Sequence, residues 1–226
     1  MSRRVETVLS TALTACAVVL TATYVYNQFG GQREGPATRS ELPSLLPEWL
    51  EITTAGSRDG PADARVVILE FSDLECPFCR ASHEMVRRLM RLHAEDIAYI
   101  FVHYPLTNHR FAMPAARAAE CARHQDSFMS MVDVLFDNQD SLGLRTWSSM
   151  AFDASVADTI GFNRCMSDST QFEAIDSGLA LGSRLGVRGT PTIVINGWRY
   201  DYAPSPAEIE RIALEILAGR EPFRQQ

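Results

Sequence analysis

The stretch EFSDLECPFC, residues 70 to 79, decides the fold of this chain, because two cysteines follow directly on an apolar run. The run ARVVILEFSD is short and rich in β-branched side chains, which is typical of a buried central strand. Pro77 follows Cys76 at a position that the first turn of a helix tolerates, and apolar residues then recur at helical spacing. We therefore predict a buried strand that ends just before Cys76 and a helix that begins there.

The chemistry of this cysteine pair has three alternatives: a redox dithiol, half of a zinc site, or two inert buried thiols. The junction places the Cys76 thiol at a helix N-terminus, where unpaired N–H groups and the helix dipole favour the thiolate. Cys79 lies one turn further on, close enough to form a disulfide with Cys76. Zinc would need two more ligands, but Cys121 and Cys165 stand alone in the sequence. We predict a redox-active disulfide, with no metal and no cofactor.

Outward from this stretch, the pattern predicts the order strand, helix, strand, helical block, hairpin, helix. EWLEITTAG is expected to form a short first strand, followed by a turn in SRDGPADA. IAYIFVHYPL is expected to be a second buried strand, and the middle of the chain is expected to be helical. In TPTIVINGWRY two apolar runs flank Asn196-Gly197, the strongest two-residue hairpin signal.

Two of the predicted helices carry start and stop signals. The last one has Ser205 as N-cap, Pro206 as its first residue and Gly219 as its stop. The helix within STQFEAIDSGLALGSRLG is expected to open with a capping box formed by Thr170 and Glu173, and to stop at Gly186.

The N-terminus differs from the rest of the chain. An uncharged run from Val8 to Tyr26 follows Arg3 and Arg4, and this length suits a helix that crosses a membrane with its start in the cytoplasm. A cleaved signal peptide and a lipoprotein signal with Cys16 as the lipidated residue are the alternatives. All three would deliver the following domain outside the cytoplasm.

We expect the chain to be organised as an anchor, a tether and one folded domain. Residues 1–26 form the membrane anchor and 27–48, rich in glycine, proline and serine, the flexible tether. Residues 49–219 form the domain, with a helical insert at about 108–186, and 220–226 a short tail.

Composition excludes some partners. The 226 residues are 46% hydrophobic and 22% charged, as in globular proteins, and the formal net charge is −7. A nucleic-acid partner would require basic faces, so we predict none. Nothing in the sequence suggests a dimerisation segment, and we predict a monomer.

The chain resembles the DsbA-like thioredoxin family, particularly its membrane-anchored bacterial thiol–disulfide oxidoreductases. EFSDLECPFC, the later GVRGTPT and the helices between them carry the resemblance, which covers roughly residues 48 to 219. It implies an α/β thioredoxin fold with an inserted helical domain. It also implies that the attacking cysteine is Cys76 and that the buried resolving cysteine is Cys79.

The resemblance also implies a substrate-binding surface formed by Pro77, Phe78, Thr190 and Pro191. The peptide bond before Pro191 would be cis, so that the backbone of Thr190 can pair with an extended substrate. An ordinary trans loop is the alternative. Where the best-known member has histidine, this chain has Phe78, which puts the oxidising strength in doubt.

Two further features have open alternatives. Glu70 lies in the strand that leads to the cysteines, and the resemblance implies a proton relay for the resolving thiol; a hydrogen-bonded structural carboxylate is the alternative. Cys121 and Cys165 are expected to form a structural disulfide, because exported proteins rarely keep free thiols. Two separate buried thiols or a second redox relay are the alternatives there. His83, His103 and His109 are assigned no role.

The predicted function is a periplasmic or cell-surface enzyme of protein folding, held by a single-pass anchor in the cytoplasmic membrane. It would introduce disulfide bonds into unfolded or reduced exported proteins and be reoxidised by a membrane quinone-linked thiol oxidase, as the resemblance implies. The alternatives are a reductase or isomerase of the same fold, and a non-catalytic membrane-tethered domain that binds peptides.

Overall fold

The structure, a computed structural model, describes residues 19, 21, 43–168, 171–200 and 204–223. The chain divides into two units, Met1–Leu42 and Pro43–Gln226. The expected anchor and most of the expected tether therefore lie outside the described residues, apart from Val19 and Thr21. Among the described residues no helix is both long and apolar enough to cross a membrane.

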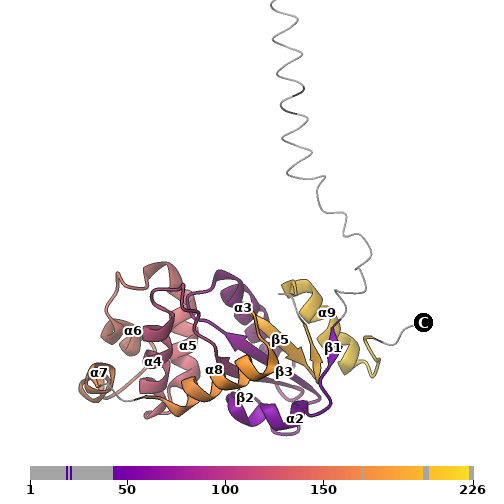
Figure 1. The fold of residues 1–226 in the computed structure, drawn as a ribbon, viewed down its shortest axis with the longest axis horizontal. Helices are drawn as coiled ribbons and strands as arrows, with labels where there is room; N and C mark the ends of the chain where they lie inside the picture. Colours follow the sequence, from indigo (N-terminus) through magenta and orange to yellow (C-terminus); the bar gives the residue numbers. More distant parts are fainter. Residues whose placement is uncertain (1–18, 20, 22–42, 169–170, 201–203, 224–226) are drawn as a thin grey trace, which may run out of the picture. The chain divides into compact units, whose positions relative to one another are not determined.

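The second unit is built on a six-stranded sheet with the order β1-β6-β5-β3-β4-β2 (Figure 1). The apolar run before the cysteines forms the central strand β3, whose seven residues are all buried, and β4 lies parallel to it. All other strand pairs are antiparallel. The strands are β1 (Ser44–Leu45), β2 (Ser57–Asp59), β3 (Val66–Ser72), β4 (Ile97–His103), β5 (Thr192–Ile195) and β6 (Trp198–Arg199).

Helices cover both faces of this sheet and extend beyond one end of it. In Figure 1 the helices α4 to α7 gather on the left, and α9 lies on the right. The helices are α2 (Trp49–Ile52), α3 (Pro77–Leu92), α4 (Ala112–Arg123), α5 (Phe128–Asp137), α6 (Trp147–Asp153), α7 (Thr159–Ser167), α8 (Glu173–Leu185) and α9 (Pro206–Leu217); the short 3₁₀ turns are η1 (Thr53–Ala55) and η2 (Gln139–Ser141). The thioredoxin-like α/β fold with inserted helices is thus confirmed.

Two apolar cores result, one on each face of the sheet. The larger contains Ile68, Tyr99 and Phe101 of the sheet together with the buried face of α3, α9 and the inserted helices. The smaller contains residues of the opposite face, against which α8 and α2 pack. Helix α8 comes so close to β4 that a Cβ atom at Gly178 would lie 2.3 Å from the carbonyl oxygen of His103.

The inserted helices are joined by a disulfide. Six alanines give α4 a small-residue surface, which lets α5 and α7 approach it closely. Cys121 of α4 is bonded to Cys165 of α7, with their Cα atoms 5.8 Å apart. The bridge spans 44 residues of sequence.

Local end signals were correct for the last helix and incorrect at the start of α8. Helix α9 begins after Ser205, whose side chain accepts a hydrogen bond from the N–H of Glu208. Gly186 and Gly219 follow α8 and α9 in the left-handed conformation, as expected for stop residues. Helix α8 begins at Glu173 after Phe172, so Glu173 is its first residue and not the third, as a capping box would require; Thr170 lies outside the described residues.

The start of the domain also differs from the prediction. The expected strand EWLEITTAG is the helix α2 followed by a 3₁₀ turn, because Trp49 and Ile52 reach the smaller core at helical spacing. The first strand after it is β2, within the segment expected to be a turn; its polar residues form an edge strand against β4. The folded unit begins at Pro43 rather than residue 49, since β1 pairs with β6.

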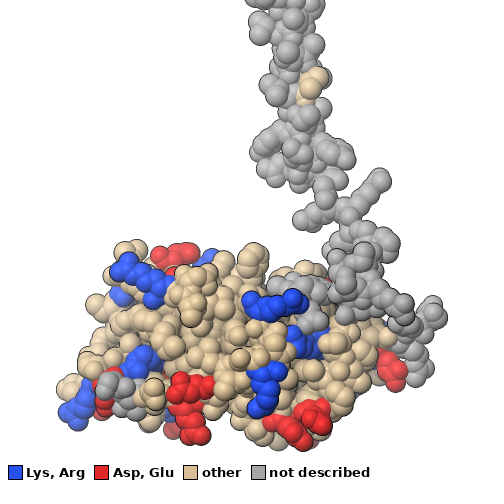
Figure 2. All heavy atoms as spheres, in the orientation of Figure 1, with Lys and Arg blue, Asp and Glu red and all other residues tan. Residues whose placement is uncertain are grey.

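Charged side chains of both signs are interspersed over the face drawn in Figure 2. Glu120 of α4 is one of the acidic residues that are buried instead: it is 4% exposed and accepts hydrogen bonds from Arg123 and His103. Burial alone would raise the pKa of Glu120, but these two partners outweigh it and lower the pKa from 4.5 to about 2.

We expect Glu120→Gln to lower the free energy of unfolding at pH 7 by about 3 kcal/mol. The folded-state pKa lies below the unfolded value, so the wild-type contribution is complete above about pH 4.5 and is lost as pH falls towards 2. Urea unfolding at several pH values measures this. The variant is expected to lose less stability on acidification, whereas exposed Glu84→Gln serves as control; parallel pH dependences for Glu120→Gln and wild type would contradict the prediction.

Candidate active site

The cysteine pair lies where the central strand passes into α3. Cys76 is the N-cap residue of α3 and Pro77 its first residue, so the fixed φ of proline suits the first turn. The N–H of Arg80 donates to the carbonyl of Cys76 at 3.1 Å, which makes this residue the start of the helix. The Cys76 thiol therefore stands at the positive end of the helix dipole.

The loop before β5 meets this thiol from a distant part of the sequence. Cys76 Sγ lies 3.3 Å from the carbonyl oxygen of Thr190, to which the thiol form donates, across 114 residues of chain. The Thr190–Pro191 peptide bond is cis. The structure thus brings together Cys76, Cys79, Pro77, Thr190 and Pro191.

The two thiols differ in exposure and in proton affinity. Cys76 is 4% exposed and Cys79 is 0% exposed. A hydrogen bond from Cys79 is the largest of the effects that lower the pKa of Cys76, from 9.0 to about 6. Burial raises the pKa of Cys79 well above its ordinary value, and so does the hydrogen bond that the Cys79 thiol donates to Cys76. The backbone N–H of Asp73 also donates to Cys79 Sγ, at 3.5 Å. Near neutral pH the arrangement provides one thiolate and one thiol.

Glu70 lies in β3 with no solvent exposure. Its Oε1 accepts from the Ser72 hydroxyl at 2.8 Å, and its Oε2 accepts from Ser82 at 2.8 Å and Tyr99 at 3.2 Å. Burial raises the pKa of Glu70 from 4.5 to about 7, although the three hydroxyls partly offset it. The carboxyl group is thus both hydrogen-bonded and poised to change protonation near neutral pH.

Pro77 and Phe78 separate the two cysteines and face outward. The side chain of Phe78 is 68% exposed, next to a nearly buried thiol. An exposed aromatic ring at this position offers apolar contact to a chain that approaches Cys76.

Two further residues hold the site and were missed from the sequence. Asp73 is buried, and its carboxylate accepts from the N–H of Glu75 and the N–H of Leu106. Gln139 of η2 donates to the carbonyl oxygens of Leu74 and Cys76 at 2.9 and 3.1 Å, and so ties the inserted helices to the cysteine loop. Asp73 could have been found as a polar residue directly after a buried strand. Nothing in the sequence around Gln139 indicated its role.

The histidines left without a role make contacts to carboxylates. His83 pairs with Asp133, and His103 pairs with Glu120. His109 pairs with Asp73. Within residues 43–168, 171–200 and 204–223, no three acidic, histidine or cysteine side chains gather as a metal site would require.

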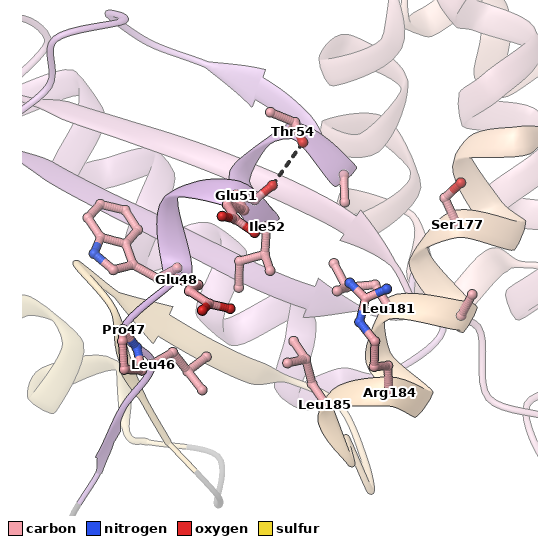
Figure 3. Close-up of a pocket in the computed structure, with 13 residues that line it drawn as sticks. Leu46, Pro47, Glu48, Glu51, Ile52, Thr54, Ser177, Leu181, Arg184 and Leu185 are labelled. Atoms are coloured by element: carbon pink, nitrogen blue, oxygen red, sulfur yellow. Dashed lines mark hydrogen bonds between the residues drawn. The ribbon is translucent and has the colours of Figure 1, made fainter.

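A surface pocket of about 530 Å³ lies away from the thiols, between α2 and α8 (Figure 3). Leu46, Ile52, Leu181 and Leu185 supply apolar walls, and Glu48 and Arg184 carry charge there. Neither cysteine of the pair lines it.

A dithiol at a strand-to-helix junction, faced by a cis-proline loop, defines a thioredoxin-type site. Residues 54–213 match the thioredoxin family model, and the chain belongs to this family. Its fold is that of the DsbA-like members. Oxidised BdbD from Bacillus subtilis matches with a TM-score of 0.63 and 21% identity, over 79% of this chain and 97% of that chain. DsbA2 from Pseudomonas aeruginosa matches with a TM-score of 0.58 and 24% identity, over 75% of this chain and 97% of that chain.

Curated relatives match over most of this chain but only part of their own length. One is the Na(+)/H(+) antiporter NhaA 3 of Salinispora tropica, 31% identical over 161 residues, which are 71% of this chain and 24% of the antiporter. Another is the Na(+)/H(+) antiporter NhaA 1 of Salinispora arenicola, 36% identical over 185 residues, which are 74% of this chain and 27% of the antiporter. The chain spans about a quarter of the length of these relatives.

Proposed function

We propose that this chain is an extracytoplasmic thiol–disulfide oxidoreductase that introduces disulfide bonds into exported proteins. The observation that carries the proposal is the asymmetry of the pair: the Cys76 thiol has a pKa of about 6 at a helix N-terminus, and Cys79 is buried with a raised pKa. The thiolate is the nucleophile and the better leaving group in thiol–disulfide exchange. Cys76 is therefore the cysteine that exchanges with substrate.

In the proposed reaction a substrate thiolate attacks Cys76 Sγ of the Cys76–Cys79 disulfide. The S–S bond breaks, Cys79 leaves as a thiolate and takes up a proton, and a mixed disulfide joins the substrate to Cys76. A second substrate thiolate attacks the substrate sulfur of that bond and releases Cys76 as a thiolate. The substrate loses two electrons and gains a disulfide, and the pair is left reduced.

The surface around Cys76 is proposed to hold the substrate. Phe78 offers an exposed ring, and the loop at Thr190 and Pro191 lies against the thiol through the Thr190 carbonyl. A backbone carbonyl beside the reacting sulfur is suited to an extended peptide, which presents N–H groups along its length. The substrates would be unfolded or reduced exported chains.

The cellular setting is also proposed. A single-pass anchor within residues 1–26 would hold the domain outside the cytoplasm, where disulfides persist. A membrane quinone-linked thiol oxidase would take two electrons from the reduced pair and restore the disulfide.

We expect the Cys76–Cys79 couple to be more oxidising than thioredoxin, at about −270 mV, and less oxidising than the strongest oxidase of this fold, at about −120 mV. Stabilising the Cys76 thiolate favours the reduced pair and so raises the potential, and each 30 mV corresponds to about 1.4 kcal/mol. Equilibration with glutathione buffers measures the potential. Phe78→His is the matched comparison, because a cationic imidazole beside Cys76 would stabilise the thiolate further and is expected to raise the reduction potential.

A potential near or below that of thioredoxin would contradict the oxidase direction and favour a reductase or isomerase. Thiol trapping in cells gives a second test, since an oxidase keeps its pair mostly disulfide-bonded. Absence of dithiol turnover in the wild-type chain would favour a peptide-binding domain instead.

A further inference from the structure

We propose that Ser72, Ser82 and Tyr99 are positioning residues that let Glu70 deliver a proton to Cys79 and take it back. This inference rests on the proposed function and on the proton relay through Glu70 that the resemblance implies, and it assigns the residues that hold Glu70 in that role. The three hydroxyl groups, here called the hydroxyl cage, surround the carboxyl group of Glu70 from three elements.

The sheet register and the helix period build the cage. Glu70 and Ser72 are two residues apart on β3 and so point to the same face. Tyr99 of β4 lies opposite Ile68, one step along that face from Glu70. Ser82 follows Cys79 by three residues on α3, so one helix face presents both the resolving thiol and a donor to Glu70.

Among the described residues, the hydroxyl groups of the cage are the hydrogen-bond partners of Glu70, and no cation donates to it. The chain contains no lysine, so no ammonium group can compensate the charge of Glu70. Arg87 of α3 is bound to Asp59 and Asp133 instead. An ammonium or guanidinium group can only donate, and it would hold Glu70 ionised, whereas serine and tyrosine hydroxyls both donate and accept. Hydroxyl groups that rotate therefore satisfy the charged and the neutral carboxyl group alike.

The donors are distributed unevenly over the two carboxylate oxygens. Oε2 accepts from both Ser82 and Tyr99, and Oε1 accepts from Ser72 only. The proton of the neutral form therefore belongs on Oε1, where turning a single hydroxyl makes room for it. Ser72 is followed by Asp73, whose N–H contacts Cys79 Sγ.

The proton balance follows the two half-reactions. When substrate attacks Cys76, the Cys79 thiolate leaves and receives the Glu70 proton, and Glu70 becomes a carboxylate. When a partner disulfide forms a mixed disulfide with Cys76, Glu70 takes the Cys79 proton. The Cys79 thiolate then attacks Cys76 Sγ and expels the partner thiolate. Both directions need a group that changes protonation near the working pH.

Few other titratable groups face Glu70. On the side of α3 the thiols of the pair interact electrostatically with Glu70, β4 contributes Tyr99, and β5 places Ile193 opposite Glu70. Beyond the Tyr99 ring, α3 and α5 contribute the charged or titratable groups His83, Arg87 and Asp133.

The test follows the protonation of Glu70 by infrared spectroscopy, through the carbonyl band of its neutral carboxyl group, assigned by subtracting the spectrum of Glu70→Gln. Tyr99→Phe and Ser82→Ala each remove one hydrogen-bond donor that stabilises the carboxylate of Glu70. Each is expected to raise the midpoint of the Glu70 titration by about one pH unit. Tyr104→Phe and Ser127→Ala are matched controls, because their hydroxyls bond to backbone carbonyls elsewhere. Unmoved midpoints in both cage variants overturn the proposal.

The second readout is the pH profile of the step in which Cys79 resolves a mixed disulfide between glutathione and Cys76. Its rate is expected to rise as Glu70 ionises, and its midpoint to shift upward with the infrared midpoint in each cage variant. A uniform loss of rate without a shift indicates a structural role only and overturns the proposal. Absence of exchange in the wild-type chain would reject the proposed function, whereas the infrared titration would still test the cage.

Discussion

Replacing Cys76 with alanine is expected to abolish thiol–disulfide exchange by this chain, down to the uncatalysed rate. At pH 7 a thiol with a pKa of about 6 is about nine-tenths ionised, whereas an ordinary thiol with a pKa of about 8.5 is about 3% ionised. Cys79 cannot substitute for it, because it is fully buried and its pKa is raised. The measurement is oxidation of a reduced test protein, together with capture of mixed disulfides on non-reducing gels.

Cys79→Ala is the matched variant, since it removes the resolving thiol and keeps the nucleophile. It is expected to accumulate mixed disulfides through Cys76, which the wild-type chain resolves too fast to retain. Loss of the hydrogen bond from Cys79 also removes the largest cause of the low pKa of Cys76. The pKa of Cys76 in this variant is therefore expected to rise, measurable by thiolate absorbance. Mixed disulfides formed through Cys79 in Cys76→Ala would contradict the assigned roles.

Removing the disulfide between Cys121 and Cys165 is expected to lower the free energy of unfolding by about 4 kcal/mol on the chain-entropy model. The bridge closes 44 residues of sequence and joins α4 to α7, so its loss frees a long loop in the unfolded chain. The double variant Cys121→Ala/Cys165→Ala, compared with wild type by urea unfolding, measures the loss without leaving a free thiol.

The activity of that double variant distinguishes a structural role of the Cys121–Cys165 disulfide from a role in the redox reaction. Cys76 and Cys79 lie in the other part of the domain, so exchange is expected to continue at temperatures where the variant stays folded. Loss of exchange in the fully folded variant would instead indicate a second redox relay. A change in stability below about 1 kcal/mol would contradict the chain-entropy argument.

The sequence by itself determined the features that local chemistry controls. The β-branched run before Cys76, the proline at the start of α3 and the caps of α9 each act within a few residues, so pattern and propensity were sufficient. The Asn196-Gly197 turn likewise joins β5 to β6 through its own backbone preference. The position of the cysteine pair at a helix N-terminus followed from the same signals.

Only the tertiary structure decided where local preference was weak or where partners were distant in sequence. The polar residues of β2 form a strand only because the edge of β4 is free to pair with them, and Trp49 and Ile52 favour a helix because the smaller core receives them. The contact of Cys76 with Thr190 spans 114 residues, and that of Gln139 with Leu74 spans 65. Glu70 was recognisable as an unusual residue, but the three hydroxyls around it come from two strands and a helix. Such groups meet through sheet register and helix packing, which no short stretch of sequence encodes.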